Sequence, residues 1–161
     1  MIKRLFILLI CSFILNNSYA SINFYEAQLI YEKLKNANGI PNAPVLVLNG
    51  STSINAETQS NQIIVNKGML DFVDNNDQLA LVLGHELAHW VNHDYLYFPI
   101  EWKEYRADSQ GLQYMENAGY NHCRGIKVFK QFKKRMGDSK SDGVHPSDID
   151  RYNYLHRGCW F

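Results

Sequence analysis

The chain has 161 residues, of which 46% are apolar and 13% aromatic, so we expect one domain with a sizeable hydrophobic core. Its formal net charge is zero, and it carries no basic run or motif typical of nucleic-acid-binding modules. We therefore expect no nucleic-acid partner.

The first 20 residues have the three parts of a secretory signal peptide. Lys3 and Arg4 precede an apolar run over residues 5–15, and Ser18-Tyr19-Ala20 offers small residues at the −3 and −1 positions of a cleavage site. The run is shorter than the roughly 20 residues that span a bilayer, which argues against a membrane anchor. Cleavage after Ala20 would leave an exported domain, residues 21–161, without a transmembrane anchor.

Cysteine usage agrees with export. Removal of residues 1–20 also removes Cys11 and leaves Cys123 and Cys159, an even number in an oxidising compartment. We expect these two to form a disulfide that ties the C-terminal tail to the helical region. Two free thiols are the alternative. Metal binding by the pair is disfavoured because neither cysteine belongs to a CxxC motif.

The first part of the domain is predicted to contain a helix and a small sheet. Apolar residues recur at helical spacing over residues 23–35, and Asn38-Gly39 is typical of a helix C-terminus. Short apolar strands are predicted at residues 45–48, 54–56 and 62–66, and a short helix at residues 68–73.

A longer helix is predicted from about Asn76 to residue 94, and it contains the motif His85-Glu86-Leu87-Ala88-His89. Residues four apart share one helix face, so His85 and His89 would offer two imidazole nitrogens to one point. That pair suits a tetrahedral zinc ion. Glu86 would lie beside the metal, where a carboxylate can take a proton from water that the metal activates.

Helices dominate the remainder of the chain. After Pro99 they are predicted at residues 100–117, 125–136 and 147–156, and the basic helix at 125–136 is expected to present a solvated face. The order of helix, small sheet and several helices predicts an α+β domain. We expect it to be mostly helical, with about three strands beside the HExxH helix.

A zinc ion needs at least one more protein ligand. The nearby candidates are Glu101, Glu104, Asp108 and His93. His93 lies one turn beyond His89, but a straight helix cannot bend three successive turns onto one ion. Glu104 and Asp108 are four apart on one predicted helix face, so Glu104 can bind the metal while Asp108 accepts a hydrogen bond from a ligand imidazole. An ordinary acidic helix face is the alternative.

The chain resembles the M48 peptidases, which are gluzincins. The matching segments follow the family's order and cover most of the mature chain. They are Asn55-Ala56, residues 63–70, residues 79–89, Glu104 with Ala107-Asp108, and His145-Pro146 with Arg151. HExxH alone is moderately specific, whereas HExxH with ExxAD and a downstream HP…R is strong evidence. The resemblance implies a zincin-like fold.

The resemblance also implies roles for the residues of the two central motifs. His85, His89 and Glu104 would bind one zinc ion per chain. Glu86 would be the general base, and Asp108 would orient a histidine ligand. The implied activity is that of a zinc endopeptidase.

Two further residues are implied by the HP…R segment. His145 and Arg151 would approach the metal site from the C-terminal side, where a cationic side chain can stabilise an oxyanion. In periplasmic members of the family, the HP histidine can instead occupy the open zinc position and keep the enzyme latent. The role of His145 stays open between these two, and a simple helix-start residue before Pro146 is the third interpretation.

The expected reaction is hydrolysis of peptide bonds in unfolded, misfolded or flexible envelope proteins. We expect the substrate to lie extended along the strand 62–66 and to add to it as a further strand. The residues of that strand are Gln62, Ile63, Ile64, Val65 and Asn66. The exported enzyme would be periplasmic, or secreted. No motif indicates an oligomeric state or a partner protein.

Two other functions stay open at this stage. One is a non-catalytic, zinc-stabilised chaperone or binding module for envelope proteins, against which the presence of Glu86 argues, because a structural zinc site requires no such carboxylate. The other is a zinc hydrolase acting on a non-protein amide such as a cell-wall peptide, which the M48 resemblance disfavours.

Overall fold

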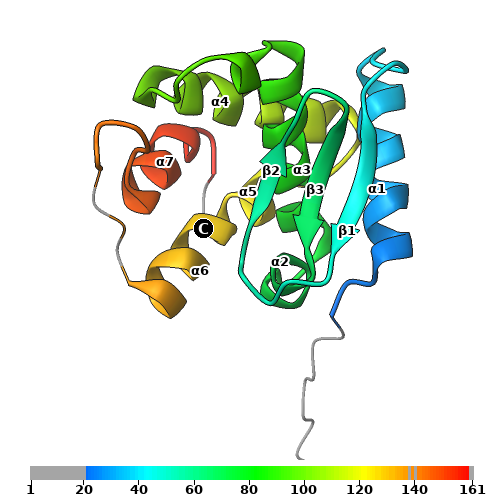
Figure 1. Cartoon of the computed structure of the whole chain (residues 1–161). Coiled ribbons are helices and arrows are strands. Elements are labelled where there is room, and N and C mark those ends of the chain that lie inside the picture. The colour runs from blue at the N-terminus through cyan, green and yellow to red at the C-terminus, as the bar shows by residue number, and fades with distance from the viewer. Residues whose placement is uncertain (1–20, 138, 140, 160–161) are drawn as a thin grey trace, which may run out of the picture.

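A three-layered arrangement of sheet, central helices and outer helices makes up the part of the chain that the computed structural model describes, residues 21–137, 139 and 141–159 (Figure 1). The predicted signal peptide, residues 1–20, lies outside these residues, and the domain boundary after Ala20 stays a prediction. None of the helices within the described ranges is both long enough and apolar enough to cross a membrane.

The elements follow the predicted order. The strands are β1 (Val45–Asn49), β2 (Ala56–Thr58) and β3 (Gln62–Asn66). The helices are α1 (Phe24–Ala37), α2 (Lys67–Phe72), α3 (Asn76–Val91), the 3-10 helix η1 (Asp94–Leu96), α4 (Glu101–Asn117), α5 (His122–Gly125), α6 (Lys127–Met136) and α7 (Asp148–Leu155). This confirms the predicted α+β class, mostly helical with a small sheet beside the HExxH helix.

Within the described residues, the three strands form one sheet in the order β1-β3-β2. The central strand β3 runs parallel to β1 and antiparallel to β2. β2 begins two residues later than predicted, because its pairing with β3 sets Ala56 opposite Val65 and Thr58 opposite Ile63. Glu57 and Thr58 lie beyond the predicted strand and are polar, but an edge strand has one solvated side on which polar residues are tolerated.

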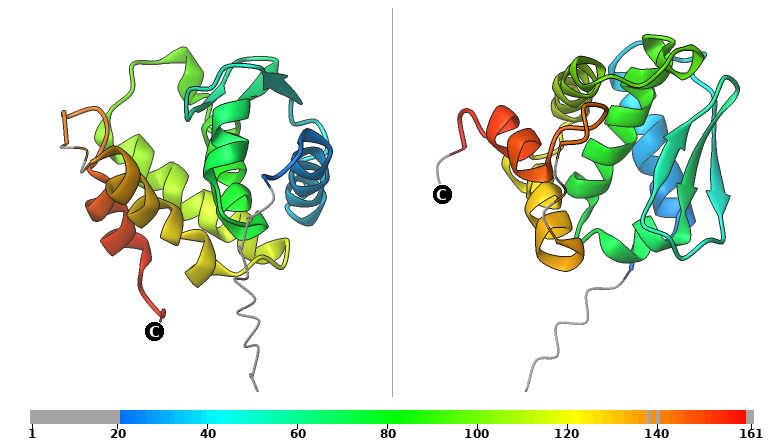
Figure 2. Two further views of the ribbon diagram at one scale, coloured as in Figure 1. Left: turned by 90° about the horizontal axis from the view of Figure 1, so that it is seen from below. Right: turned by 60° about the vertical axis from the view of Figure 1, so that its left-hand side comes forward.

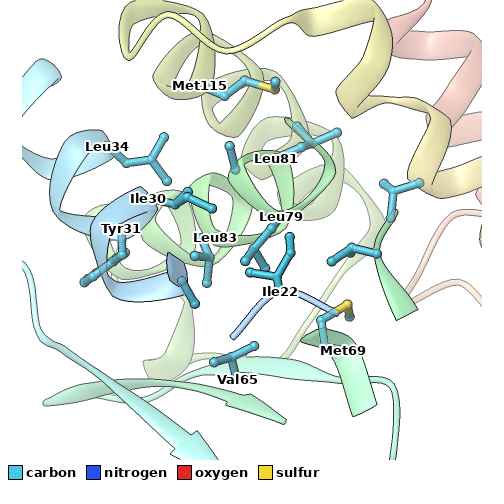
Figure 3. Packing of buried hydrophobic residues seen from close by; sticks show 14 of the residues in the cluster. Ile22, Ile30, Tyr31, Leu34, Val65, Met69, Leu79, Leu81, Leu83 and Met115 are labelled. Carbon is cyan, nitrogen blue, oxygen red and sulfur yellow. The ribbon is translucent and has the colours of Figure 1, made fainter. Parts of the chain in front are cut away.

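The core lies between one face of the sheet and the helices α1 and α3. Both helices lie on the same side of the sheet, as the left view of Figure 2 shows, and α4, α6 and α7 are further away. Figure 3 shows Ile30 and Leu34 of α1 meeting Leu79 and Leu83 of α3, with Val65 of β3 beneath them. Leu34, Val65, Leu79 and Leu83 are fully buried. This packing makes α3 the helix that the other elements surround.

The helices α3 and α4 touch backbone to backbone where Gly84 and Gly111 meet. A Cβ atom on Gly84 would lie 2.7 Å from the carbonyl oxygen of Gly111, and one on Gly111 would lie 2.6 Å from the backbone nitrogen of His85. Only glycine allows this approach, since such distances are far below van der Waals contact. The crossing sets the first turns of α4 beside His85.

α3 ends at Val91 rather than near residue 94 as predicted. The Asn92 side chain donates to the carbonyl of Ala88, 2.7 Å away, and His93 then adopts a left-handed conformation with φ of 55°. No proline or glycine marks this end, so the sequence pattern gave no signal of it. The turn at His93 redirects the chain so that Asp94 lies back against the helix.

The C-terminal helices are fastened by a disulfide. Cys123 of α5 is bonded to Cys159 with Cα atoms 5.5 Å apart, the pair that the sequence predicts. The short helix α5 was not expected. It begins with an Asn121 cap whose side chain accepts from the backbone N–H of Arg124. As a result α6 begins at Lys127, two residues later than predicted.

Candidate active site

His85 and His89 of α3 both direct their Nε2 atoms towards one point. Nε2 of His85 and Nε2 of His89 are 3.0 Å apart. Their side chains are 12% and 14% exposed, so both lie in the wall of a cleft rather than on an open surface. The four-residue spacing on a straight helix produces this convergence, as predicted from the motif.

Glu104 of α4 completes the group. Its carboxylate oxygens lie 3.4 Å from Nε2 of His89 and 3.6 Å from Nε2 of His85. Ligand atoms that bind one tetrahedral zinc ion at about 2.0–2.1 Å are about 3.3–3.4 Å from one another. The three side chains therefore fit a zinc ion in donor type and in spacing, and neither α3 nor α4 has to move to bring them together. Their role as ligands stays a prediction.

Each histidine has its other ring nitrogen beside a carboxylate. Nδ1 of His85 lies 2.9 Å from Asp108 Oδ1, and Nδ1 of His89 lies 3.0 Å from Asp94 Oδ2. A proton on each Nδ1 would be donated to its carboxylate, and this tautomer would leave both Nε2 lone pairs free for a metal. The pairing of Asp108 with a histidine is the arrangement the sequence predicts.

Asp94 was not predicted as part of the site. Had α3 continued to residue 94, the five-residue separation from His89 would have pointed Asp94 well away from the zinc-facing side of the helix. The left-handed turn at His93 brings it back, and its carboxylate is then held by Arg106 Nη2 at 2.6 Å and Lys103 Nζ at 3.7 Å. His93 itself is exposed and outside the group of converging atoms.

The charges around the histidines favour a bound cation. Burial by itself raises the pKa of Glu104, but the hydrogen bond with His89 and the charges of His85, His89 and Arg151 lower it to about 2. Burial lowers the pKa of His89, yet Glu104, Glu86 and Asp94 together raise it to about 9. An ionised carboxylate beside the His89 imidazole, which attracts positive charge, is a suitable environment for a divalent ion.

Arg151 of α7 contacts Asp108 and also lines the cleft. Its Nε donates to Asp108 Oδ2 at 2.8 Å and its Nη2 donates to Oδ1 at 2.5 Å. Burial raises the pKa of the Asp108 carboxyl, but Arg151 and His85 outweigh it and hold this pKa well below its usual range. Two of its nitrogens therefore hold the Asp108 carboxylate, and the predicted oxyanion role of Arg151 stays a prediction.

His145 lies at the edge of the cleft. Its side chain is 58% exposed, and its Nδ1 is 3.6 Å from Glu104 Oε2. Asp142 fastens the segment before α7, since its Oδ1 accepts from the backbone N–H groups of Val144 and His145. This position is within reach of the metal group, and it is compatible with both roles left open for His145.

The general base predicted at Glu86 is held by a residue that the sequence did not indicate. Thr58 Oγ1 of β2 lies 2.7 Å from Glu86 Oε2 and 2.7 Å from the Glu86 carbonyl oxygen. Glu86 is only 8% exposed, and its side chain lines the same cleft as the histidines. Thr58 links the edge strand to the HExxH helix at the point where the chemistry is expected.

The converging atoms lie in a cleft of about 520 Å³. β2, with the residue before it, and the segment that joins α3 to α4 both contribute to its lining. The lining residues are Asn55, Ala56, Glu57, Thr58, His85, Glu86, His89, Asp94, Tyr95, Tyr97, Pro99, Lys103, Glu104, His145 and Arg151.

The strand predicted to bind the substrate has no free edge. Gln62, Ile63, Ile64, Val65 and Asn66 form β3, which is paired with β1 on one edge and with β2 on the other. A strand with both edges paired has no free N–H and C=O row to offer to a peptide. The strand that borders the cleft is β2, and no strand of the described part of the chain pairs with its outer edge.

Comparison with known proteins gives one family. The model of peptidase family M48 matches residues 22–100, from the start of α1 to the segment before α4, and so includes the HExxH motif. Glu104, Asp108, His145 and Arg151 lie outside the matched residues. No curated protein matches the chain.

Proposed function

Because the chain belongs to peptidase family M48, we propose that it is an exported zinc endopeptidase that hydrolyses unfolded or flexible polypeptides. Zinc metallopeptidase activity in general follows from the family. Export, the polypeptide class and the residue roles are our proposal.

One observation carries the proposal of a peptidase site in this chain. Nitrogen atoms of His85 and His89 and the carboxylate of Glu104 all lie within 4.8 Å of one another, and Glu86 lines the same cleft. A purely structural zinc site usually has four protein ligands, whereas a catalytic one keeps a position open. Three converging ligands beside an additional carboxylate match the second kind.

His85, His89 and Glu104 would hold the ion. When bound, zinc polarises the scissile carbonyl and lowers the pKa of water from about 15.7 to about 7. The carboxylates of Asp108 and Asp94 keep the two imidazoles in the tautomer that presents Nε2.

Glu86 supplies the proton transfers. Its carboxylate accepts a proton from the attacking water, and the resulting acid then protonates the amine that leaves. Thr58 holds the carboxylate in place, since its hydroxyl is within hydrogen-bonding distance of Oε2. A general base must keep its orientation through both transfers, so this contact supports the assignment.

The substrate is proposed to bind against β2. This edge strand, Ala56–Thr58, borders the cleft directly beside Glu86. An extended peptide that adds to such an edge forms main-chain hydrogen bonds irrespective of its side chains. The substrate must therefore be locally unfolded, and polypeptides with flexible or misfolded segments are the proposed partners.

Export is supported by two independent features. Residues 1–20 have the pattern of a signal peptide, and the Cys123–Cys159 disulfide is typical of an oxidising compartment. The periplasm is the proposed location, with secretion as the alternative.

The test is zinc content and casein cleavage of residues 21–161, measured beside Glu86→Gln. We expect stoichiometric zinc in both proteins and cleavage only by the unsubstituted chain. Zinc in both with no cleavage in either would favour the non-catalytic binding module, unless His145→Ala restores cleavage and so reveals a latent enzyme. Absence of zinc from both would contradict the proposal.

A further inference from the structure

A group of large apolar side chains projects into solvent between α3 and α4. We define this aromatic rim as residues 95–100 together with Trp102. Phe98 is 90% exposed, the most exposed large apolar side chain in the described part of the chain, and Tyr97, Leu96 and Trp102 are 67%, 63% and 55% exposed. Single exposed apolar residues are ordinary, but a contiguous group of this size marks a binding surface.

The backbone beneath the rim is fastened. Lys103, only 7% exposed, donates from Nζ to the Phe98 carbonyl at 3.2 Å, and the same Nζ lies 5.1 Å from the centre of the Tyr97 ring. The guanidinium of Arg106 lies 4.7 Å from the centre of the Trp102 ring. A segment held at its base in this way presents its side chains in a defined position, which lowers the entropy lost on binding.

The rim is continuous with the cleft that holds the candidate zinc ligands. Tyr95, Tyr97 and Pro99 line that cleft. The same three residues, with Leu96 and Phe98, line an adjoining hollow of about 400 Å³. A peptide that pairs with β2 therefore enters the same cleft that these three rim residues line.

The charges beside the rim argue for a peptide rather than a lipid surface. Interfacial segments that bind membranes combine exposed apolar residues with cations available for anionic headgroups. Here Lys103 and Arg106 both face the buried carboxylate of Asp94, and Glu101 beside Trp102 is acidic and accepts from Ser141. Both cations of the described segment 95–106 are therefore paired with Asp94.

We propose that the aromatic rim binds large apolar side chains of the peptide substrate and so selects segments that a folded protein would bury. This inference rests on the proposed function and deepens it, because it adds a side-chain preference to the backbone recognition by β2. Leu96 and Phe98 are the residues that would set the preference, since they line the outer hollow but not the cleft of the zinc ligands.

The test uses two fluorogenic peptides of the same length, one with phenylalanine and leucine around the cleaved bond and one with serine at those positions. The rim variant is Leu96→Ser with Phe98→Ser. The matched control is Tyr25→Ser with Leu29→Ser on α1, whose side chains are 68% and 53% exposed. We expect KM for the apolar peptide to rise about tenfold in the rim variant, since burial of large apolar side chains contributes at least this factor.

In the rim variant we expect kcat for the apolar peptide to stay unchanged, and likewise both kcat and KM for the serine peptide. The control variant should have the kinetic constants of the unsubstituted chain with both peptides. An equal loss with both peptides, an equal loss in the control, or an unchanged KM would overturn the proposal. So would rim-dependent sedimentation with anionic vesicles while KM stays constant, which would indicate a membrane surface.

A binding measurement separates this inference from the proposed function. The dissociation constants of both peptides are measured by fluorescence anisotropy in the Glu86→Gln background, which requires no turnover. Tighter binding of the apolar peptide that is lost with the rim variant supports the inference even if the unsubstituted chain cleaves neither peptide. Equal binding of both peptides contradicts it, whether or not the chain is a peptidase.

Discussion

On each side of the candidate metal site an aspartate carboxylate contacts Nδ1 of a histidine, but the surroundings of the two aspartates differ. On one side Asp108 of α4 accepts from His85, is fully buried and is held by Arg151 through two short hydrogen bonds. On the other side Asp94 accepts from His89, follows a left-handed turn and is held by Arg106, whose side chain is 31% exposed. One side is part of the helical core, and the other belongs to the surface segment that carries the aromatic rim.

Each of the two histidines is oriented by a carboxylate, but the two carboxylates depend on different parts of the fold. Asp108 and Arg151 join α4 to α7, so the orientation of His85 depends on tertiary packing. Asp94 and Lys103 join His89 to the carbonyl of Phe98, so the orientation of His89 depends on the segment that the substrate is proposed to contact. We expect substitutions on the first side to affect folding most, and substitutions on the second side to affect metal and peptide binding most.

The largest effect is expected for Asp108→Asn. Loss of the carboxylate leaves the Arg151 guanidinium, whose side chain is only 18% exposed, without its counter-charge, which costs about 3–5 kcal/mol in the free energy of unfolding. Zinc affinity should fall by about 10–100-fold because His85 loses its acceptor. Urea unfolding and competition with a zinc chelator measure the two effects. The double variant Asp108→Asn with Arg151→Met should recover stability but not zinc affinity, and recovery of both would contradict the assigned role.

Gly111→Ala should have the next largest effect. The new Cβ would lie 2.6 Å from the backbone nitrogen of His85, so α3 and α4 must move apart. Overpacking of this kind costs about 1–3 kcal/mol, and the shift would separate Glu104 from the two histidines. Thermal unfolding with and without zinc measures both consequences. Gly50→Ala is the control, because nothing lies within 4 Å of a Cβ at that position. Equal effects in the two variants would argue against the helix crossing as the cause.

Asp94→Asn should destabilise the fold by less than Asp108→Asn, about 1 kcal/mol. Arg106 can reach solvent when its partner is lost, and Lys103 keeps its hydrogen bond to the Phe98 carbonyl and its contact with the Tyr97 ring. Zinc affinity should still fall by about tenfold, since His89 loses the acceptor that orients it. The comparison of unfolding and chelator competition for the two asparagine variants is the direct test. A stability loss as large as that of Asp108→Asn would remove the distinction between the two sides.

Thr58→Val should leave folding and zinc binding almost unchanged. The variant removes the hydroxyl that holds Glu86 but keeps the shape of the side chain, so we expect kcat to fall by about tenfold while KM stays constant, the order expected for a misoriented general base. Steady-state kinetics on casein-derived peptides measure the split. Thr52→Val is a control at a threonine outside the cleft lining. A fall in zinc content with Thr58→Val would show that β2 supports the ligands rather than the base.

Features that depend on local chain geometry could be predicted from the sequence. The spacing of His85 and His89, and of Glu104 and Asp108, is meaningful because an α-helix repeats every 3.6 residues, so each pair shares a face wherever the helix lies. The α+β order of elements and the Cys123–Cys159 pair followed from apolar patterning and from an even number of cysteines. These inferences needed no knowledge of how the helices pack.

Features that depend on how elements meet required the tertiary structure. Asp94 reaches His89 only because His93 adopts a positive φ, and no residue type in that segment demands it. The apolar strand 62–66 is the central strand of the sheet, paired on both sides, so it has no edge for a substrate. Edge strands are short and polar, so β2 was the weaker sequence signal although it borders the active-site cleft. Periodicity therefore determined which side chains share a face, whereas the backbone contact of Gly84 with Gly111 decided that those faces meet around one point.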